Sequence, residues 1–365
     1  MKRFFNYVVI MLMCPMLVLS CSSDNGTSSS ETEEETGSTT ADPIDITTCD
    51  SETGINQLVC IAEAFLSQLS SSEQTTVQLS YSTTTAKKWS NFPESIYRNR
   101  PGLSFGEMTD TKVSYAKALI KAAAGTTSNE GWEEIEQTLN ADDYLNAAGG
   151  GSGYGAGNYY IAILGTPSTT GLWEIMFGGH HFALANTYEG GVLVGATPSF
   201  RGIEPYGTFT YNSESNQPLN QERDAFSEML EGLSSSELTT AKLSGTWNDL
   251  LCGPQSDDNF PSTASGVQVG TLTSAQQELV MAAIKTYVLD IADDDAADIL
   301  TTYENELSNT YVSYSGTTTM TTKGDYVRID GPSVWIEFSV QNGVILSDPH
   351  PHSVWRDKNG DYGGN

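Results

Sequence analysis

The chain of 365 residues has 38% hydrophobic side chains, enough to form one large folded domain or two small ones. It carries 46 acidic against 17 basic side chains, a formal net charge of −29. Nucleic-acid binding depends on Lys and Arg neutralising phosphate, so this charge argues against nucleic acid as a partner. The sequence contains neither a P-loop pattern nor the Gly-x-Ser-x-Gly elbow of many hydrolases.

Residues 1–20 are typical of a secretory signal, with a basic start and an apolar run from Val8 to Leu19. This run is too short for a stable membrane-spanning helix. Its ending, Leu17-Val18-Leu19-Ser20-Cys21, resembles a bacterial lipobox, in which the cysteine becomes the lipidated first residue of the mature protein. We therefore expect a lipoprotein of the bacterial cell envelope that is attached to the membrane through Cys21.

Residues 21–57 are rich in Ser, Thr, Glu and Asp and contain few large apolar side chains, which predicts a disordered tether. In an oxidising exported compartment, Cys49 and Cys60 can form a disulfide that pins the tether to the first helix. Cys252 is then a lone buried thiol, and no Cys-x-x-Cys spacing indicates a thiolate metal site.

The remaining residues, 58–365, predict a single globular domain of two related halves, at about 58–215 and 216–365. Several landmarks recur in the same order in both halves: Leu69-Ser-Ser-Ser-Glu73 and Leu233-Ser-Ser-Ser-Glu237, apolar helical segments around 109–124 and 273–291, the strand-like runs Tyr160–Leu164 and Tyr326–Asp330, and Trp173 and Trp335.

In each half the helices come first and the strands second, which indicates an α+β fold rather than alternating βαβ units. We expect the two halves to pack about a pseudo-twofold axis and to contain antiparallel hairpins.

All four histidines lie in two places, each after a Trp-led run that predicts a strand. His180 and His181 follow Gly178-Gly179, which predicts a turn. His350 and His352 follow Asn342-Gly343, the strongest short hairpin signal. The two pairs therefore resemble equivalents on two related hairpins. Imidazole is largely neutral near pH 7 and offers a nitrogen lone pair, so it suits a divalent metal.

Strand geometry limits which histidines can share one centre. Adjacent residues such as His180 and His181 point to opposite faces, whereas His350 and His352 point to the same face. We expect a centre of His350, His352 and one of the adjacent pair, with a carboxylate or water completing the open arrangement of a catalytic metal. We favour His181 as the inward residue, although a bulge at the Gly-Gly turn can reverse the facing.

The ligand types leave zinc, iron, manganese and copper open as the metal. The histidines can also be hydrogen-bonding groups that fix two turns. Three further residues are candidates for catalysis. Glu204, in a loop bounded by Gly and Pro, and Glu174 are candidates for proton transfer. Arg356 can clamp a substrate carboxylate or form an internal ion pair.

A set of motifs resembles an uncharacterised bacterial family catalogued as domain of unknown function 3500. They are Trp89–Pro93, Gly102-Leu103, Phe177–His181, Thr197–Pro205, Tyr326–Pro332 and His350–Asp357 with Asp361-Tyr-Gly363. The resemblance covers roughly residues 60–363 and implies domain boundaries, but no reaction. It also implies a helical tail after Asp361-Tyr-Gly363, of which this sequence contains Gly364 and Asn365.

Two functions follow from these features. The first is a metal-dependent enzyme of the cell envelope that acts on a small molecule by hydrolysis or oxidation. The second is a non-catalytic lipoprotein that binds a small ligand in a cleft between the halves, with the histidines as hydrogen-bonding groups. A purely structural scaffold would leave the histidines buried and apart. The sequence defines no oligomeric state.

Overall fold

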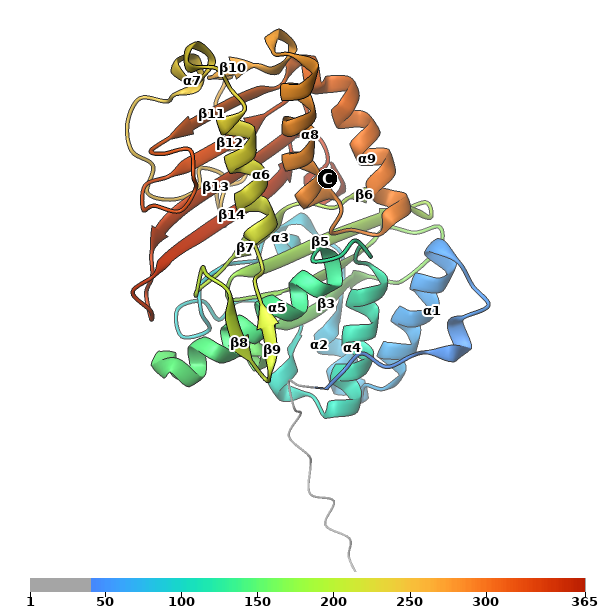
Figure 1. The fold of residues 1–365 in the computed structure, drawn as a ribbon. Helices are drawn as coiled ribbons and strands as arrows, with labels where there is room; N and C mark the ends of the chain where they lie inside the picture. Colours follow the sequence, from blue (N-terminus) through green and yellow to red (C-terminus); the bar gives the residue numbers. More distant parts are fainter. Residues whose placement is uncertain (1–40, 365) are drawn as a thin grey trace, which may run out of the picture. The chain divides into compact units, whose positions relative to one another are not determined.

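The structure is a computed structural model that describes residues 41–364. These residues form one large sheet with helices (Figure 1). The predicted signal peptide, Cys21 and the beginning of the predicted tether lie outside these residues. The described end of the tether is structured. Cys49 is buried in a short 3-10 helix at Thr47–Cys49, and the Ile44 amide donates to the Ser114 carbonyl.

The predicted helices are present. Their bounds, with those of the other helices, are α1 Gly54–Ser67, α2 Ser71–Val77, α3 Thr83–Ala86, α4 Asp110–Ala122, α5 Gly131–Leu145, α6 Asn220–Glu231, α7 Ser235–Ala241, α8 Ser274–Val288 and α9 Asp293–Glu306. Their apolar faces are buried, for instance Val113, Ala116 and Ile120 of α4. This spacing of three and four residues is the pattern by which a helix packs on a sheet.

The strands are β1 Gln78–Leu79, β2 Leu103–Ser104, β3 Tyr160–Gly165, β4 Trp173–Gly179, β5 Phe182–Glu189, β6 Val192–Gly195, β7 Ser199–Gly202, β8 Phe209–Tyr211, β9 Glu214–Asn216, β10 Val267–Gln268, β11 Tyr311–Ser315, β12 Tyr326–Asp330, β13 Val334–Asn342 and β14 Pro349–Asp357. Twelve of them form one mostly antiparallel sheet in the order β1-β3-β4-β5-β7-β14-β13-β12-β11-β10, with β2 beside β3 and β6 beside β5. The predicted class, helices with antiparallel hairpins, is confirmed.

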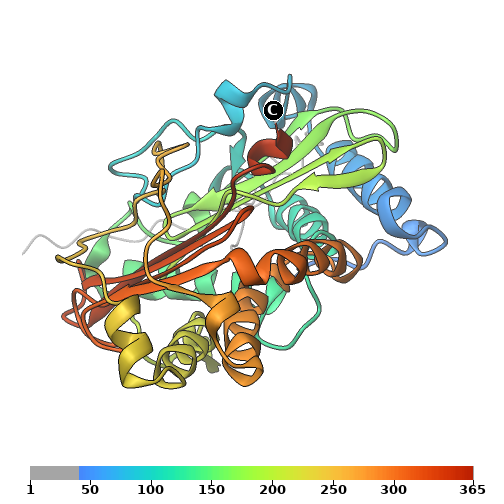
Figure 2. The same ribbon diagram turned by 90° about the horizontal axis from the view of Figure 1, so that it is seen from above.

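The two faces of the sheet differ. The longer helices α4, α5, α6, α8 and α9 cover one face (Figure 1), and the loops around α3 lie on the other (Figure 2). Alternate residues of β14 follow this division. Trp355 packs in the core that α8 and α9 share, whereas Val354 packs with Trp89 and Phe200 on the loop face. The even-numbered residues of β14 therefore face the loops.

The recurring serine motifs form equivalent local structures. Ser70 caps α2 and Ser234 caps α7, each in a capping box completed by Glu73 or Glu237. The predicted strand matches, in contrast, fall at different places. β3 is separated from the central β7–β14 contact by β4 and β5, whereas β12 is separated from it by β13 alone. The runs beginning at Tyr160 and Tyr326 are therefore not counterparts in the sheet.

The hairpin between β13 and β14 forms after Asn342 as predicted, but the turn between β4 and β5 differs from the prediction. Gly178 and Gly179 belong to β4, and the turn is His180-His181 itself, with His181 at φ 68°. The glycines are required by close packing. A Cβ on Gly179 would lie 2.6 Å from the Tyr159 ring.

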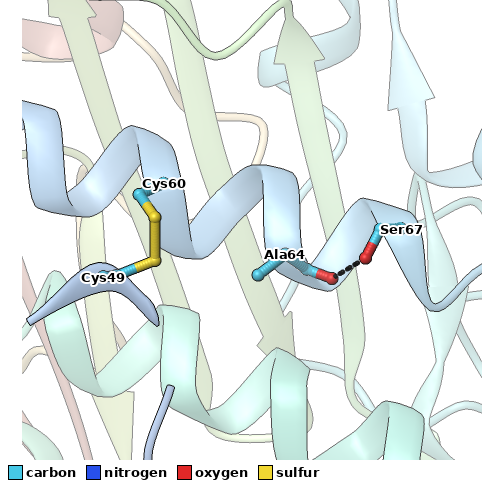
Figure 3. The surroundings of a disulfide bond; sticks show 4 residues. All are labelled: Cys49, Cys60, Ala64 and Ser67. Atoms are coloured by element: carbon cyan, nitrogen blue, oxygen red, sulfur yellow. Dashed lines mark hydrogen bonds between the residues drawn. A yellow bond between two sulfur atoms is a disulfide. The ribbon is translucent and has the colours of Figure 1, made fainter. Parts of the chain in front are cut away.

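A disulfide joins Cys49 to Cys60 and ties the short helix before α1 to α1 (Figure 3). The Cα atoms of the two cysteines are 5.8 Å apart. The third described cysteine, Cys252, is a buried free thiol. Both features agree with the expectation from the sequence.

Candidate metal centre

Three of the four histidines converge at the middle of the sheet. His181 lies in the β4–β5 turn, and His350 and His352 lie on the loop face of β14. The His181 carbonyl accepts from the Gly202 amide at 2.7 Å, and Gly202 is the sheet neighbour of His352. The turn is thereby held against β7 and β14, which brings residues distant in sequence to one point.

The three Nε2 atoms face one another. The Nε2 atom of His350 is 2.8 Å from that of His181 and 2.9 Å from that of His352. The ligand atoms of this group all lie within 4.8 Å of one another. All three side chains are buried, with exposed fractions of 3 to 6%. The two histidine pairs are thus unequal, because only one member of the adjacent pair joins the cluster.

The outer nitrogens of two of these rings are fixed by acceptors. His350 Nδ1 lies 3.2 Å from the Asn342 carbonyl, and His352 Nδ1 lies 3.1 Å from the Asp249 carboxylate. The Gln341 amide also lies 2.7 Å from His352 Nδ1. In the tautomer that places the proton on Nδ1, beside these acceptors, Nε2 keeps its lone pair and can bind a metal. Carbonyl and carboxylate partners of this kind orient the histidine ligands of metal sites.

The surroundings of His181 and His350 favour their neutral imidazole form. Burial lowers the pKa of His181 well below 6.5, and the neighbouring histidines lower it further. Burial, followed by His352 and His180, lowers the pKa of His350 to about 3. Neutral imidazoles are the form that binds a metal, but several nitrogen lone pairs at such short distances repel one another unless a cation lies between them.

The geometry fits a metal ion. Three imidazole nitrogens bound tetrahedrally at about 2.0 to 2.1 Å lie about 3.3 Å from each other. The observed 2.8 and 2.9 Å are shorter by roughly 0.5 Å, a gap that small ring movements close. Three protein nitrogens leave at least one position for water or another ligand, and this donor set is compatible with zinc, iron, manganese or copper.

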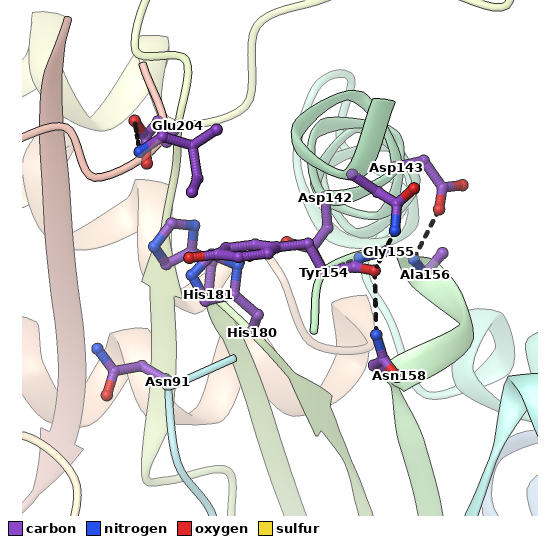
Figure 4. A network of polar contacts seen from close by, with 12 residues as sticks. Asn91, Asp142, Asp143, Tyr154, Gly155, Ala156, Asn158, His180, His181 and Glu204 are labelled. Carbon is purple, nitrogen blue, oxygen red and sulfur yellow. Dashed lines mark hydrogen bonds and ion pairs between the residues drawn. The ribbon is translucent and has the colours of Figure 1, made fainter. Parts of the chain in front are cut away.

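His180 has a different environment. Its Nδ1 lies 2.5 Å from the Asp142 carboxylate of α5, and its ring stacks on that of His181 at 3.6 Å between centroids. The Tyr154 ring meets His180 edge-on at 4.9 Å, and Figure 4 shows Tyr154 and Asn91 beside the histidine pair. Asp142 also accepts from the Gly155 amide. His180 is therefore a neighbour of the cluster, held by Asp142, rather than a member of it.

Glu204 approaches His350 on the Nδ1 side of the ring, and Figure 4 shows Glu204 above His181. One carboxylate oxygen accepts from the amides of Ile345 and Leu346, and the other is buried with no hydrogen-bond partner, 4.0 Å from His350 Nδ1. The carboxylate is on the outer side of the ring, away from the converging Nε2 atoms. Glu204 can position the His350 ring. It does not lie beside the open position of the metal, where a proton-transfer group would act.

Glu174 and Arg356 lie away from the cluster. Glu174 is six residues before His180 on β4, a distance of about 20 Å along an extended strand. Arg356 is four residues beyond His352, about 13 Å away. Its guanidinium contacts the carbonyls of Cys252 and Gly253 and the carboxylates Asp257 and Asp361. Arg356 thus lies in an internal ion-pair network, which is the alternative that the sequence left open beside substrate anchoring.

Several residues of the site were not indicated by the sequence: Asn91, Asp142, Tyr154, Asp249, Gln341 and Asn342. They come from four separate segments. Asn342 is at the hairpin turn, which places its carbonyl near the start of β14. The other five residues lie in no recognisable motif with a histidine.

Within residues 41–364, no helix has the length and apolar character needed to cross a bilayer. Comparison with curated proteins and with solved structures gives no match. The model of the family described as "Protein of unknown function (DUF3500)" matches residues 51–364, so the chain belongs to this family.

Proposed function

We propose that the chain is a lipid-anchored enzyme of the cell envelope with a metal centre at His181, His350 and His352. It would bind zinc, iron, manganese or copper and act on a small molecule by hydrolysis or oxidation. The observation that carries the proposal is the convergence of the three buried Nε2 atoms. In two of these rings the outer nitrogen, Nδ1, lies beside an acceptor: the Asn342 carbonyl at His350 and the Asp249 carboxylate at His352.

A metal bound there would supply Lewis acidity at its open position. The chain's own groups around that position fit the handling of a polar substrate. The Asn91 amide is 3.5 Å from His352 Nε2 and can donate to a bound oxygen. The His180–Asp142 pair next to His181 is a histidine–carboxylate pair of the kind that accepts and returns a proton. This pair replaces Glu174 as the nearest candidate for proton transfer.

The rim of the centre favours a ligand with an apolar part. Phe92 follows Asn91 in the chain and is 46% exposed, and Ile96 in the same loop is 69% exposed. Val344, two residues after Asn342, is 70% exposed. Asn91 and Asn342 contact the histidines, and exposed large apolar side chains that follow them closely in the chain are typical of a binding surface. We infer a small organic molecule that carries both a polar reacting group and an apolar portion.

Metal analysis of tag-free protein tests the proposal. We expect about one equivalent of a transition metal after reconstitution, and each of His181→Ala, His350→Ala and His352→Ala is expected to weaken binding by at least about 100-fold. His180→Ala is the matched control and should retain the metal, because its ring is held by Asp142 outside the cluster. Circular dichroism establishes that each variant is folded.

The alternative is a non-catalytic lipoprotein that binds a small ligand at the same histidines. The short distances between the Nε2 atoms favour this alternative, because 2.8 and 2.9 Å are also hydrogen-bond lengths between rings that share protons. Less than about a tenth of an equivalent of any of the four metals, before and after reconstitution, would contradict the metal centre and leave this function.

We also propose that the chain arose by duplication and that its halves are related by a pseudo-twofold axis. Along the main path of the sheet, five strands end at β7 on one side of the β7–β14 contact and five end at β14 on the other, which supports this origin, while β2 and β6 are additional strands of the first half. The positive φ angles of Gly102 and Gly266, each against the backbone of a strand, support it as well. A chain with the halves in exchanged order should fold with an unchanged circular dichroism spectrum. A chain that stays unfolded would contradict the symmetric packing.

A further inference from the structure

A second cluster of ionisable groups lies on the helix face of β7, directly opposite the histidines. Arg201 is adjacent to Gly202 and is the sheet neighbour of Ser353, whose hydroxyl contacts Tyr287 of α8. Four carboxylates surround this arginine: Glu130, Glu134, Glu222 and Asp290. Their ligand oxygens all lie within 4.8 Å of one another. The cluster joins α5, α6, the end of α8 and β7.

Arg201 forms ion pairs with two of the four carboxylates. Its Nε donates to Glu134 at 3.1 Å, and its guanidinium forms an ion pair with Asp290. Asp290 also accepts from the Gly131 amide at 2.6 Å, and Glu130 has one long contact of 3.5 Å with the Gln221 amide. One guanidinium therefore faces four acidic groups.

Glu222 has no such partner among the described residues. Its side chain is 0% exposed, and neither carboxylate oxygen accepts a hydrogen bond. One oxygen of Glu134 in the same cluster is likewise buried and without a partner. Leaving a charged carboxylate buried and unpaired is strongly unfavourable, so Glu222 must either hold a proton or lie beside a positively charged species.

We propose that Glu130, Glu134, Glu222 and Asp290 bind a divalent cation that prefers oxygen ligands, such as Ca²⁺, Mg²⁺ or Mn²⁺. The donor atoms are all oxygens, which these ions select over the softer metals suited to histidine. The spacing also fits. Oxygens bound to one Ca²⁺ at 2.3 to 2.6 Å are at most about 5 Å apart, and the four carboxylate oxygens all lie within 4.8 Å of one another.

The cation has a structural role in this position. It would hold the first turns of α5 and α6 and the segment after α8 to β7, the strand that supports the histidine turn from behind. A ligand that binds the folded chain and not the unfolded chain raises stability in proportion to its saturation. Binding of the cation should therefore be measurable as an increase in the stability of the folded chain, without an assay of activity.

The test uses the full mature chain, stripped with a chelator and titrated with Ca²⁺, Mg²⁺ or Mn²⁺ while thermal unfolding is followed. We expect at least one of these ions to raise the wild-type melting temperature by about 5 °C. Glu222→Gln, which preserves shape and removes the charge, should abolish the rise. Glu228→Gln on the exposed side of the same helix is the matched control and should retain it.

The same titration on His350→Ala separates this site from the histidine centre, since the rise should persist there. Protons are the competing explanation, because burial and the neighbouring carboxylates raise the pKa of Glu222. The proposal is overturned if none of the three ions stabilises the wild type, or if Glu222→Gln responds as the wild type does. Stabilisation of the stripped wild type by acid alone, with no response to cations, would also overturn it.

Discussion

Gly202 allows the histidine rings to meet on the loop face of β7. A Cβ placed on it would lie 2.9 Å from Cδ2 of His181 and 3.1 Å from Cδ2 of His352, closer than carbon atoms normally approach. We expect Gly202→Ala to separate the rings and lower metal affinity by about 10- to 100-fold, as losing a supporting group of a metal site does.

Metal titration of folded protein measures this effect. Gly207→Ala is the matched control, because a Cβ there meets no atom within 4 Å. Equal affinities of the Gly202 and Gly207 variants would show that the rings do not depend on this close contact.

Glu174, although remote from the histidines, controls stability as a function of pH. The Thr187 hydroxyl donates a hydrogen bond to the Glu174 carboxylate at 2.9 Å, and burial raises the pKa of Glu174 from 4.5 to about 7. The folded protein holds this proton more tightly than the unfolded chain, so the carboxyl's contribution to stability falls as the pH rises from 4.5 to about 7. Above that range the charged carboxylate costs about 3 kcal/mol.

Glu174→Gln should remove this cost and keep the contact with Thr187. Urea unfolding is therefore expected to show the variant more stable than the wild type by up to about 3 kcal/mol at pH 8, with the difference vanishing toward pH 4.5. Glu189→Gln, at the exposed end of β5, should change little at either pH. A gain for Glu174→Gln that is equal at both pH values would rule out ionisation as its cause.

The sequence identified the histidines because they are few and clustered, but it could not assign their partners. Strand parity indicated that only one of His180 and His181 faces the centre, with His181 preferred, and the structure places His181 in the cluster through a turn instead. Asp142 and Asp249 approach the histidines from segments 38 and 103 residues away. Single-sequence patterns record spacing within an element and contain no information on contacts at such separations.

At the level of elements, the apolar periodicity and the residues at the helix starts were sufficient to predict where the helices lie. The apolar spacing and Ser or Thr caps gave α4 and α8 nearly to their ends. The turn at Gly178-Gly179 was misplaced, because glycines required by close packing, here against the Phe182 backbone and the Tyr159 ring, have the same appearance in a sequence as glycines required by a turn. Composition also extended the tether to residue 57, since η1 (Thr47–Cys49) is held by a disulfide rather than by an apolar surface.

That disulfide should contribute measurably to stability. Cys49 and Cys60 are 11 residues apart, and closing a loop of this length in the unfolded chain corresponds to about 3 kcal/mol. We expect the double variant Cys49→Ala/Cys60→Ala to unfold at a lower temperature than the wild type. Reductant should lower the wild-type melting temperature toward that of the variant and leave the variant unchanged. A wild type that is insensitive to reductant would contradict the stabilising role.

At the level of the whole molecule, the sheet order was the least predictable feature. Local repeats indicated two related halves, yet the matched tyrosine runs occupy different places in the sheet, because sequence similarity between short apolar strands does not determine which neighbours they pair with. The central contact between β7 and β14 joins the two predicted halves in one sheet. The position of the histidine centre follows from this contact, which no local pattern specifies.

The last prediction concerns attachment to the membrane, for which Cys21 is the expected site. Without lipid, a chain with a net charge of −29 is repelled by an anionic bilayer, and no described helix can span one. Cys21→Ser should therefore move the protein from the membrane fraction to the soluble exported fraction. Ser28→Ala, in the predicted tether, is the matched control and should remain with the membrane. Retention of the Cys21→Ser protein on membranes washed with high salt would contradict lipid attachment, since neither charge nor an acyl chain would then explain it.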